Sequence, residues 1–183
     1  MAHILVVGGT GMLSGVSRLL ASDGHTVSVV GRSITKMNSL QSSLPPQVHI
    51  HPLLVDYNHV SKFREQIRLA IQLYGPIDCA IVWVHSYAKH TLPVLIEEVA
   101  VSSVDWELFH VVGSSTDLPS IKDELPLPTS CSYYQIKLGF IVEEKRSRWL
   151  THAEISSGVL QSIAEKEPSY IVGTVQPWDA RPQ

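Results

Sequence analysis

The chain has 183 residues and a formal net charge of −3, and 17% of its residues are charged. This length suits one domain with a sizeable buried core, so we expect a single domain over residues 1–183. The mild negative charge is unlike the basic surface of nucleic-acid-binding proteins, and we therefore expect no nucleic-acid partner.

The cysteine content and the N-terminus predict where the protein acts. Cys79 and Cys131 are the only cysteines, and Cys79 lies inside an apolar run, which suits a reduced thiol better than a disulfide framework. The apolar run of residues 4–7 is too short for a signal peptide or a membrane span. We expect a cytoplasmic protein with no membrane partner.

The first predicted elements are a buried strand, a glycine-rich turn and an amphipathic helix. The turn contains Gly8, Gly9, Thr10, Gly11, Met12 and Leu13. Glycines at three of these positions permit a positive φ and a close approach of phosphate oxygens to the backbone. The helix that follows offers unpaired N–H groups and the positive end of its dipole. The pattern predicts a site for a dinucleotide diphosphate.

The second predicted strand ends at a basic residue. NAD-binding folds place a carboxylate about 20 residues beyond the glycines, where it binds the ribose 2′-hydroxyl. No carboxylate lies between Gly24 and Ser43, and Arg32 occupies this region with Ser33 and Lys36. A guanidinium there favours the 2′-phosphate of NADP(H) over NAD(H). The alternative is a solvated surface arginine.

Apolar runs that predict strands alternate with helical patterns along the rest of the chain. The predicted strands cover residues 4–7, 26–30, 48–55, 106–112, 133–143 and 169–175. Residues 74–84 are predicted to be a turn followed by a further strand, the fourth in chain order. The predicted helices begin near residues 12, 34, 59, 93 and 151, with Asn58 as cap of the third and a capping box at Thr151 for the last. This alternation predicts an α/β fold, a single doubly wound parallel sheet with strand order 3-2-1-4-5-6-7.

Several of these segments together resemble the short-chain dehydrogenase/reductase family. They are the Gly8–Gly9–Thr10–Gly11 turn, Arg32, Asp56, the run Tyr74–Gly75–Pro76–Ile77–Asp78 and the pair Ser114–Ser115. The resemblance covers residues 3 to about 115. It implies a Rossmann-like three-layer sandwich, an NADP cofactor, a small carbonyl or alcohol substrate, and homo-oligomers.

The same resemblance extends the predicted cofactor site beyond the turn. It implies that Asp56 contacts the adenine ring, together with Tyr57, and Val84 at the end of the fourth strand joins this site. An Asx-type turn is an equally good interpretation of Asp56 from the sequence alone.

The catalytic signature of the family is incomplete here. Trp83–Val84–His85–Ser86 stands where the family has Asn-Ala-Gly, and no asparagine follows Asn58. The rest of the family signature is a serine followed by Tyr-x-x-x-Lys. Ser114, Tyr133 and Lys137 match it in residue type and spacing, and Ser115 is an alternative to Ser114. In the family the tyrosine and lysine lie one turn apart on a helix, where the lysine lowers the phenol pKa.

The residues around Tyr133 favour a strand over a catalytic helix. Apolar residues alternate at period two through 134–142, which is typical of extended chain. On a strand, Tyr133 and Lys137 would lie roughly 13 Å apart, at about 3.3 Å per residue, too far for proton transfer. We therefore predict that residues 133–143 are extended and central in the sheet, while the catalytic helix stays open as an alternative.

Four histidines complete the candidate residues. His85 follows the fourth strand, where open α/β sheets bind ligands, and is either a rim residue or a substrate contact. His110 is predicted to be a packed core residue. His49 and His51 share a strand face without a further ligand cluster, so we expect no metal site.

Two functions fit these observations. The first is an NADP-dependent oxidoreductase that acts on a small carbonyl or alcohol. The second is a catalytically degenerate NADP-sensing or scaffold protein of the same fold. Both bind NADP, and only turnover separates them.

Overall fold

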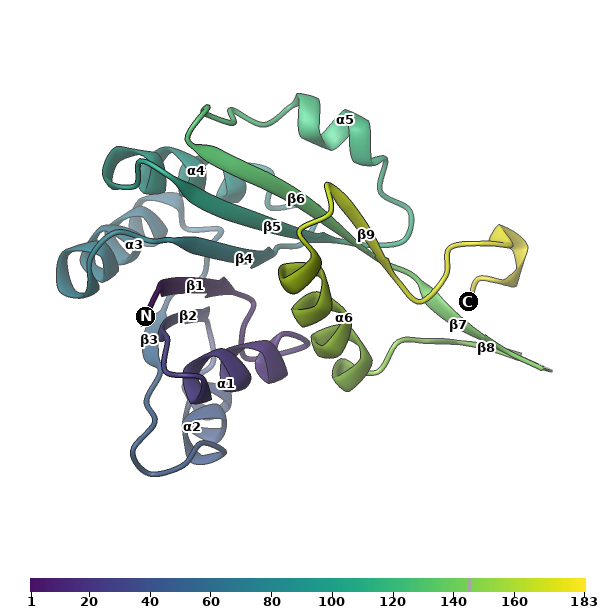
Figure 1. Ribbon diagram of the computed structural model, residues 1–183, viewed down its shortest axis with the longest axis horizontal. Coiled ribbons are helices and arrows are strands. Elements are labelled where there is room, and N and C mark those ends of the chain that lie inside the picture. The colour runs from purple at the N-terminus through teal and green to yellow at the C-terminus, as the bar shows by residue number, and fades with distance from the viewer. Residues whose placement is uncertain (145) are drawn as a thin grey trace.

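The computed structural model describes residues 1–144 and 146–183. Within them, a seven-stranded parallel sheet has the order β3-β2-β1-β4-β5-β6-β9 (Figure 1). Its strands are β3 (His51–Leu54), β2 (Thr26–Gly31), β1 (His3–Val7), β4 (Cys79–Trp83), β5 (Trp106–Val112), β6 (Cys131–Leu138) and β9 (Ser169–Val172). The predicted order 3-2-1-4-5-6-7 is confirmed, with β9 as the seventh strand.

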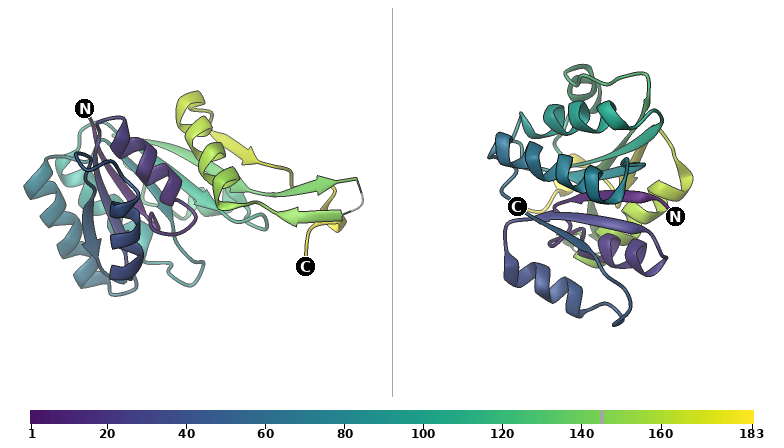
Figure 2. Two further views of the ribbon diagram at one scale, coloured as in Figure 1. Left: turned by 90° about the horizontal axis from the view of Figure 1, so that it is seen from below. Right: turned by 90° about the vertical axis from the view of Figure 1, so that its left-hand side faces the viewer.

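Helices cover both faces of this sheet, as the two views of Figure 2 show. One face packs against α1 (Ser14–Ser22), α2 (Ile34–Ser42) and α6 (His152–Glu165), and the other packs against α3 (Val60–Tyr74) and α4 (Thr91–Ser102). The short helix α5 (Leu118–Asp123) connects β5 to β6. β1 is buried along its whole length because both of its faces are covered. The fold is the predicted three-layer, Rossmann-like α/β sandwich.

The predicted cap residue is correct at α6 and wrong at α3, although the predicted start of α3 near residue 59 agrees with the observed Val60–Tyr74. At α6 the Thr151 side chain accepts from the Glu154 N–H at 3.2 Å, and Glu154 accepts from the Thr151 N–H at 2.8 Å. Asn58 does not cap α3, because its side chain donates to Asp56 at 3.0 Å and His59 occupies the cap position.

The prediction that residues 133–143 form one central strand is right only as far as Leu138. The chain leaves the sheet at Gly139, and β7 (Phe140–Glu143) pairs with β8 (Arg146–Trp149) in an antiparallel hairpin that projects from the body (Figure 2). A Cβ atom at Gly139 would overlap the backbone carbonyl of Thr174. The alternating pattern continues through both strands, so it does not reveal this break.

Among the residues that the structure describes, no helix combines the length and the apolar character needed to cross a membrane.

We expect Gly139→Ala to lower the free energy of unfolding by about 2–3 kcal/mol, because the added methyl group meets rigid backbone. Gly113→Ala is the matched control, since a Cβ there has no neighbour within 4 Å, and it should change stability by no more than about 0.5 kcal/mol. Urea denaturation measures both variants. Equal stability of the two would contradict the close approach of Gly139 to Thr174.

Candidate functional site

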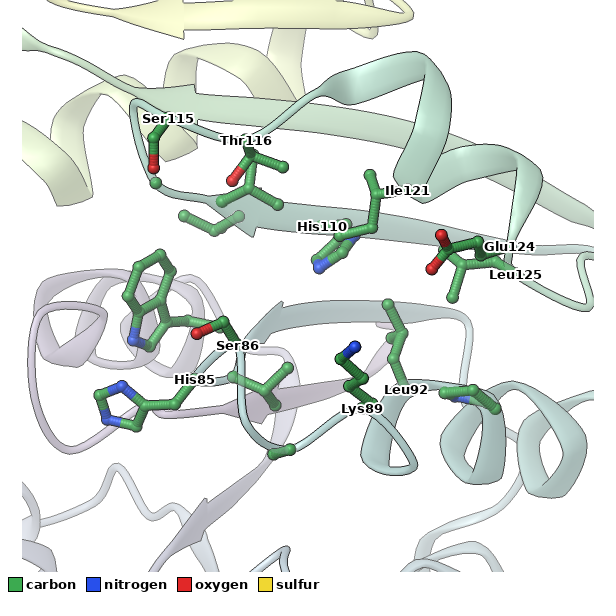
Figure 3. A pocket seen from close by; sticks show the side chains of 17 residues that line it. His85, Ser86, Lys89, Leu92, His110, Ser115, Thr116, Ile121, Glu124 and Leu125 are labelled. Atoms are coloured by element: carbon green, nitrogen blue, oxygen red, sulfur yellow. The ribbon is translucent and has the colours of Figure 1, made fainter.

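Two cavities lie at the carboxyl ends of the central strands. β1 and β4 are neighbours in the sheet, and the strand order runs outward from them in both directions, which makes this the switch point where open α/β sheets bind ligands. The smaller cavity, about 330 Å³, is lined by the glycine turn and the end of β2. The larger cavity, about 520 Å³, lies between β5, α4 and α5 (Figure 3). Trp83 and His85 line both cavities.

The glycine turn approaches its neighbours so closely that side chains are excluded. Gly8 has a φ of 83°, and a Cβ there would lie 3.0 Å from the carbonyl oxygen of Trp83. A Cβ at Gly9 would lie 2.6 Å from the hydroxyl of Ser17 in α1. These contacts hold α1 tightly against β1 and leave the backbone of the turn open toward the smaller cavity.

The hydrogen bonds of the turn leave donors for a ligand. The Gly11 N–H donates to the Gly8 carbonyl at 3.3 Å, and the Ser14 N–H donates to the Gly11 carbonyl at 3.0 Å. In the described part of the chain, the N–H groups of Met12 and Leu13 have no acceptor, and no side chain caps α1. Gly8, Thr10, Gly11 and Met12 line the smaller cavity. The turn can therefore offer N–H groups to an anion.

The segment from the end of β2 into α2 brings basic groups to the same cavity. Arg32, Ser33 and Lys36 all line it. The side chain of Arg32 is 62% exposed, and its Nη1 lies 3.7 Å from the Asp56 carboxylate. Ser33 caps α2 by accepting from the Lys36 N–H at 3.3 Å. Arg32 and Lys36 give this cavity the positive charge that a phosphate group needs.

Asp56 and Tyr57 follow β3 and differ in their contacts. Asp56 accepts from the Asn58 N–H at 2.9 Å, which is the Asx turn that the sequence left open, and this bond is the main reason for its lowered pKa. Tyr57 lines the smaller cavity, and its hydroxyl accepts from the His85 N–H at 3.3 Å. Val84 lines the larger cavity instead.

His152 lines the smaller cavity and was not predicted from the sequence. It lies in the first turn of α6, which packs against α1 because Gly15 leaves room for Ser156. The Ser156 hydroxyl donates to the Met12 carbonyl at 3.1 Å. The capping box at Thr151 signals where α6 begins, but nothing local to it indicates that the helix end reaches the glycine turn.

The structure does not bring together Ser114, Tyr133 and Lys137, the three residues that match the family's catalytic signature. Ser114 is buried, and its hydroxyl accepts from Arg181 Nε at 3.2 Å, whereas Ser115 lines the larger cavity. Tyr133 and Lys137 both lie on β6, opposite Leu108 and Val112 of β5. Their strand spacing of roughly 13 Å excludes direct contact between Tyr133 and Lys137.

Tyr133 instead belongs to a buried polar chain beside the larger cavity. Its hydroxyl lies 2.8 Å from Nδ1 of His110 and accepts from Gln135 Nε2 at 3.2 Å. Gln135 Nε2 also donates to the Leu118 carbonyl at 2.8 Å. Burial raises the pKa of Tyr133 to about 12 and lowers that of His110 to about 4. Both groups are therefore neutral near pH 7.

Comparison with solved structures shows that this fold is similar to that of short-chain dehydrogenases/reductases. An alcohol dehydrogenase from the archaeon Thermococcus sibiricus, complexed with 5-hydroxy-NADP, superposes with a TM-score of 0.68 and 13% identity, covering 100% of this chain and 99% of that one. A short-chain dehydrogenase/reductase from Serratia marcescens gives 0.70 and 14%, covering 94% and 97%. YwfH, an NADPH-dependent reductase involved in bacilysin biosynthesis, gives 0.71 and 12%, covering 94% and 99%.

No protein-family model matches the sequence, and no curated protein matches it either. The family resemblance of the glycine turn and the later segments therefore agrees with the fold, at a sequence identity of 12–14%.

The buried His110 predicts a pH-dependent stability. The unfolded chain takes up a proton near the ordinary pKa of 6.5, whereas folded His110 stays neutral down to about 4. Stability from this group is therefore present above pH 6.5 and is lost as the pH falls toward 4, by up to about 3 kcal/mol at about 1.4 kcal/mol per pKa unit. Urea denaturation at several pH values between 4 and 7 gives the free energy of unfolding at each pH. This free energy should fall less steeply with decreasing pH in His110→Gln than in the unsubstituted protein. Identical slopes would contradict a neutral, buried His110.

Proposed function

We propose that this protein binds NADP(H) in the smaller cavity and transfers a hydride between the nicotinamide and a small carbonyl or alcohol in the larger cavity. The observation that carries the proposal is the junction of the two cavities at Trp83 and His85, beside the glycine turn. A cofactor that extends from Arg32 across the turn would reach this junction, where its redox end would meet a substrate.

The residues around the smaller cavity fit the parts of NADP. The Met12 and Leu13 N–H groups and the first turn of α1 suit the diphosphate. Arg32 and Lys36 suit the 2′-phosphate, with the Ser33 hydroxyl beside them. Tyr57 suits the adenosine end, because its ring lies between the end of β3 and the His85 backbone.

Bound NADPH would supply the hydride to a carbonyl carbon, and a proton would complete the alcohol. The chain's own contribution would be to hold the two molecules in one geometry and to hydrogen-bond the substrate oxygen. His85, at the junction, is exposed to solvent, and its imidazole can hydrogen-bond the substrate oxygen there. The separation of Tyr133 from Lys137 supports a route that does not use them as a pair.

The same separation also favours a second candidate, an NADP-sensing or scaffold protein that binds the cofactor without turnover. The two candidates differ in one observable, which is the oxidation of NADPH in the presence of a panel of aldehydes and ketones. We favour the oxidoreductase because the larger cavity adjoins the smaller one and contains polar groups.

The thiols support a reducing, cytoplasmic compartment for this activity. Cys79 and Cys131 are both free, and Cys79 is buried in β4. Burial raises the pKa of the Cys131 thiol to about 12, so this thiol stays protonated and unreactive at neutral pH.

Arg32→Ala should weaken NADP binding by about 1.5–3 kcal/mol, since it removes a charge-assisted contact to the 2′-phosphate. NAD affinity should change little. Arg146→Ala in the hairpin is the matched control, because Arg146 pairs with Glu143 and lines neither cavity. Isothermal titration calorimetry measures all four affinities, and an unchanged NADP affinity in Arg32→Ala would contradict the assigned 2′-phosphate site.

Lys137→Met should leave the rate of NADPH oxidation within about twofold of the original. If Lys137 lowered the pKa of a catalytic tyrosine, its removal would impair general acid catalysis, which accelerates such a step about 10²–10⁴-fold. The rate is followed by NADPH absorbance with the most reactive aldehyde of the panel. A loss of two orders of magnitude in this variant would restore the helical catalytic interpretation of Tyr133 and Lys137.

A further inference from the structure

The larger cavity has an apolar wall with one buried polar side chain in it. Its apolar lining comes from the loop between β4 and α4, from α4 and β5, and from α5 and the residues after it, and includes Val84, Leu92, Val111, Val112, Ile121 and Leu125. The charged residues Lys89 and Glu124 also line it, but both are exposed to solvent. His110 is only 4% exposed, and Figure 3 shows its ring directed from β5 into the cavity.

The hydrogen-bond chain behind His110 favours one of its two neutral tautomers, the one in which the Tyr133 hydroxyl has an acceptor. The Leu118 carbonyl only accepts, so the atom of Gln135 that faces it at 2.8 Å is the amide nitrogen. The second hydrogen of that nitrogen points to the Tyr133 oxygen at 3.2 Å. Tyr133 then keeps its own hydrogen for Nδ1 of His110, 2.8 Å away.

Because Nδ1 accepts from Tyr133, neutral His110 carries its proton on Nε2. Among the described residues, Nε2 has no hydrogen-bond partner, and His110 lines the cavity. Nε2 therefore faces the accessible space of the cavity, where the oxygen of a ligand can accept its hydrogen bond.

We propose that His110 is a substrate-binding residue: it presents a fixed Nε2–H donor to the carbonyl oxygen of an uncharged, largely apolar ketone or aldehyde in the larger cavity. This inference rests on the proposed function for the ligand's role as substrate, and it adds the residue and the ligand class. Tyr133 and Gln135 are positioning residues, since they act through His110.

The donor-only character of this position gives the cavity its selectivity. A carbonyl oxygen accepts the hydrogen bond, whereas a hydrocarbon of the same shape leaves Nε2–H unsatisfied. A charged carboxylate would have to shed its hydration shell in a cavity whose walls are mainly apolar, and it is disfavoured.

The tautomer is measured first, in ¹⁵N-histidine-labelled protein at pH 7. A long-range ¹H–¹⁵N spectrum should show His110 with Nε2 protonated and Nδ1 unprotonated. In Tyr133→Phe the tautomers should mix, because Nδ1 loses its donor. A proton on Nδ1 in the unsubstituted protein would overturn the proposal.

Ligand selectivity is measured next with two probes of nearly equal shape, cyclohexanone and methylenecyclohexane. Cyclohexanone should shift the His110 Nε2–H resonance in a saturable way and bind on the order of three- to tenfold more tightly than the hydrocarbon, as one neutral hydrogen bond allows. His110→Leu should bind both probes equally. His90→Leu, an exposed histidine outside both cavities, should keep the preference for the ketone. If His110→Leu fails to fold, His110→Phe provides a second apolar replacement.

Equal affinity of the two probes for the unsubstituted protein would overturn the role of His110. The probe titrations need no cofactor, and NADP binding is measured separately by calorimetry. Absent NADP binding with a retained ketone preference would overturn the proposed oxidoreductase and leave a carbonyl-binding cavity. Retained NADP binding without the preference would overturn the role of His110 alone.

Discussion

No side chain fits at position 9, and the rest of the site depends on this constraint. A Cβ there would lie 2.6–2.9 Å from Ser17, Val29 and Val6, which belong to α1, β2 and β1. Glycine lets these three elements meet, and Gly8 beside it turns the chain with a φ of 83°. Because α1 is held so near the sheet, its first N–H groups lie at the switch point between β1 and β4.

The order of the sheet then decides which residues share the site. β2 contributes basic groups at its end, and β4 contributes Trp83 and the following His85 to both cavities. β5 and β6 are in parallel register, which pairs His110 with Gln135 and places Tyr133 close enough to bond His110. The polar chain beside the larger cavity is thus a consequence of strand register, and Tyr133 contacts His110 in it rather than Lys137.

The sequence predicted the sheet order, the glycine turn, the helix start at Thr151 and the extended conformation of residues 133–138, because each has a local signal. Glycine spacing, period-two alternation and a capping box are all visible within a few residues. The hairpin of β7 and β8 was missed because the alternation of apolar residues continues across Gly139. The chain leaves the sheet there because Thr174, distant in the sequence, lies against Gly139. The place of His152 at the smaller cavity and the contact between Tyr133 and His110 were missed for a related reason, since each depends on a tertiary neighbour with no sequence signal.

NADP binding at the glycine turn is tested most directly by a crystal structure of the protein grown with NADPH. The proposed site predicts the diphosphate against the Met12 and Leu13 N–H groups, the 2′-phosphate within hydrogen-bonding distance of Arg32, and the nicotinamide beside Trp83 and His85. Electron density for the dinucleotide at any other place, or a diphosphate that contacts neither the turn nor α1, would contradict it.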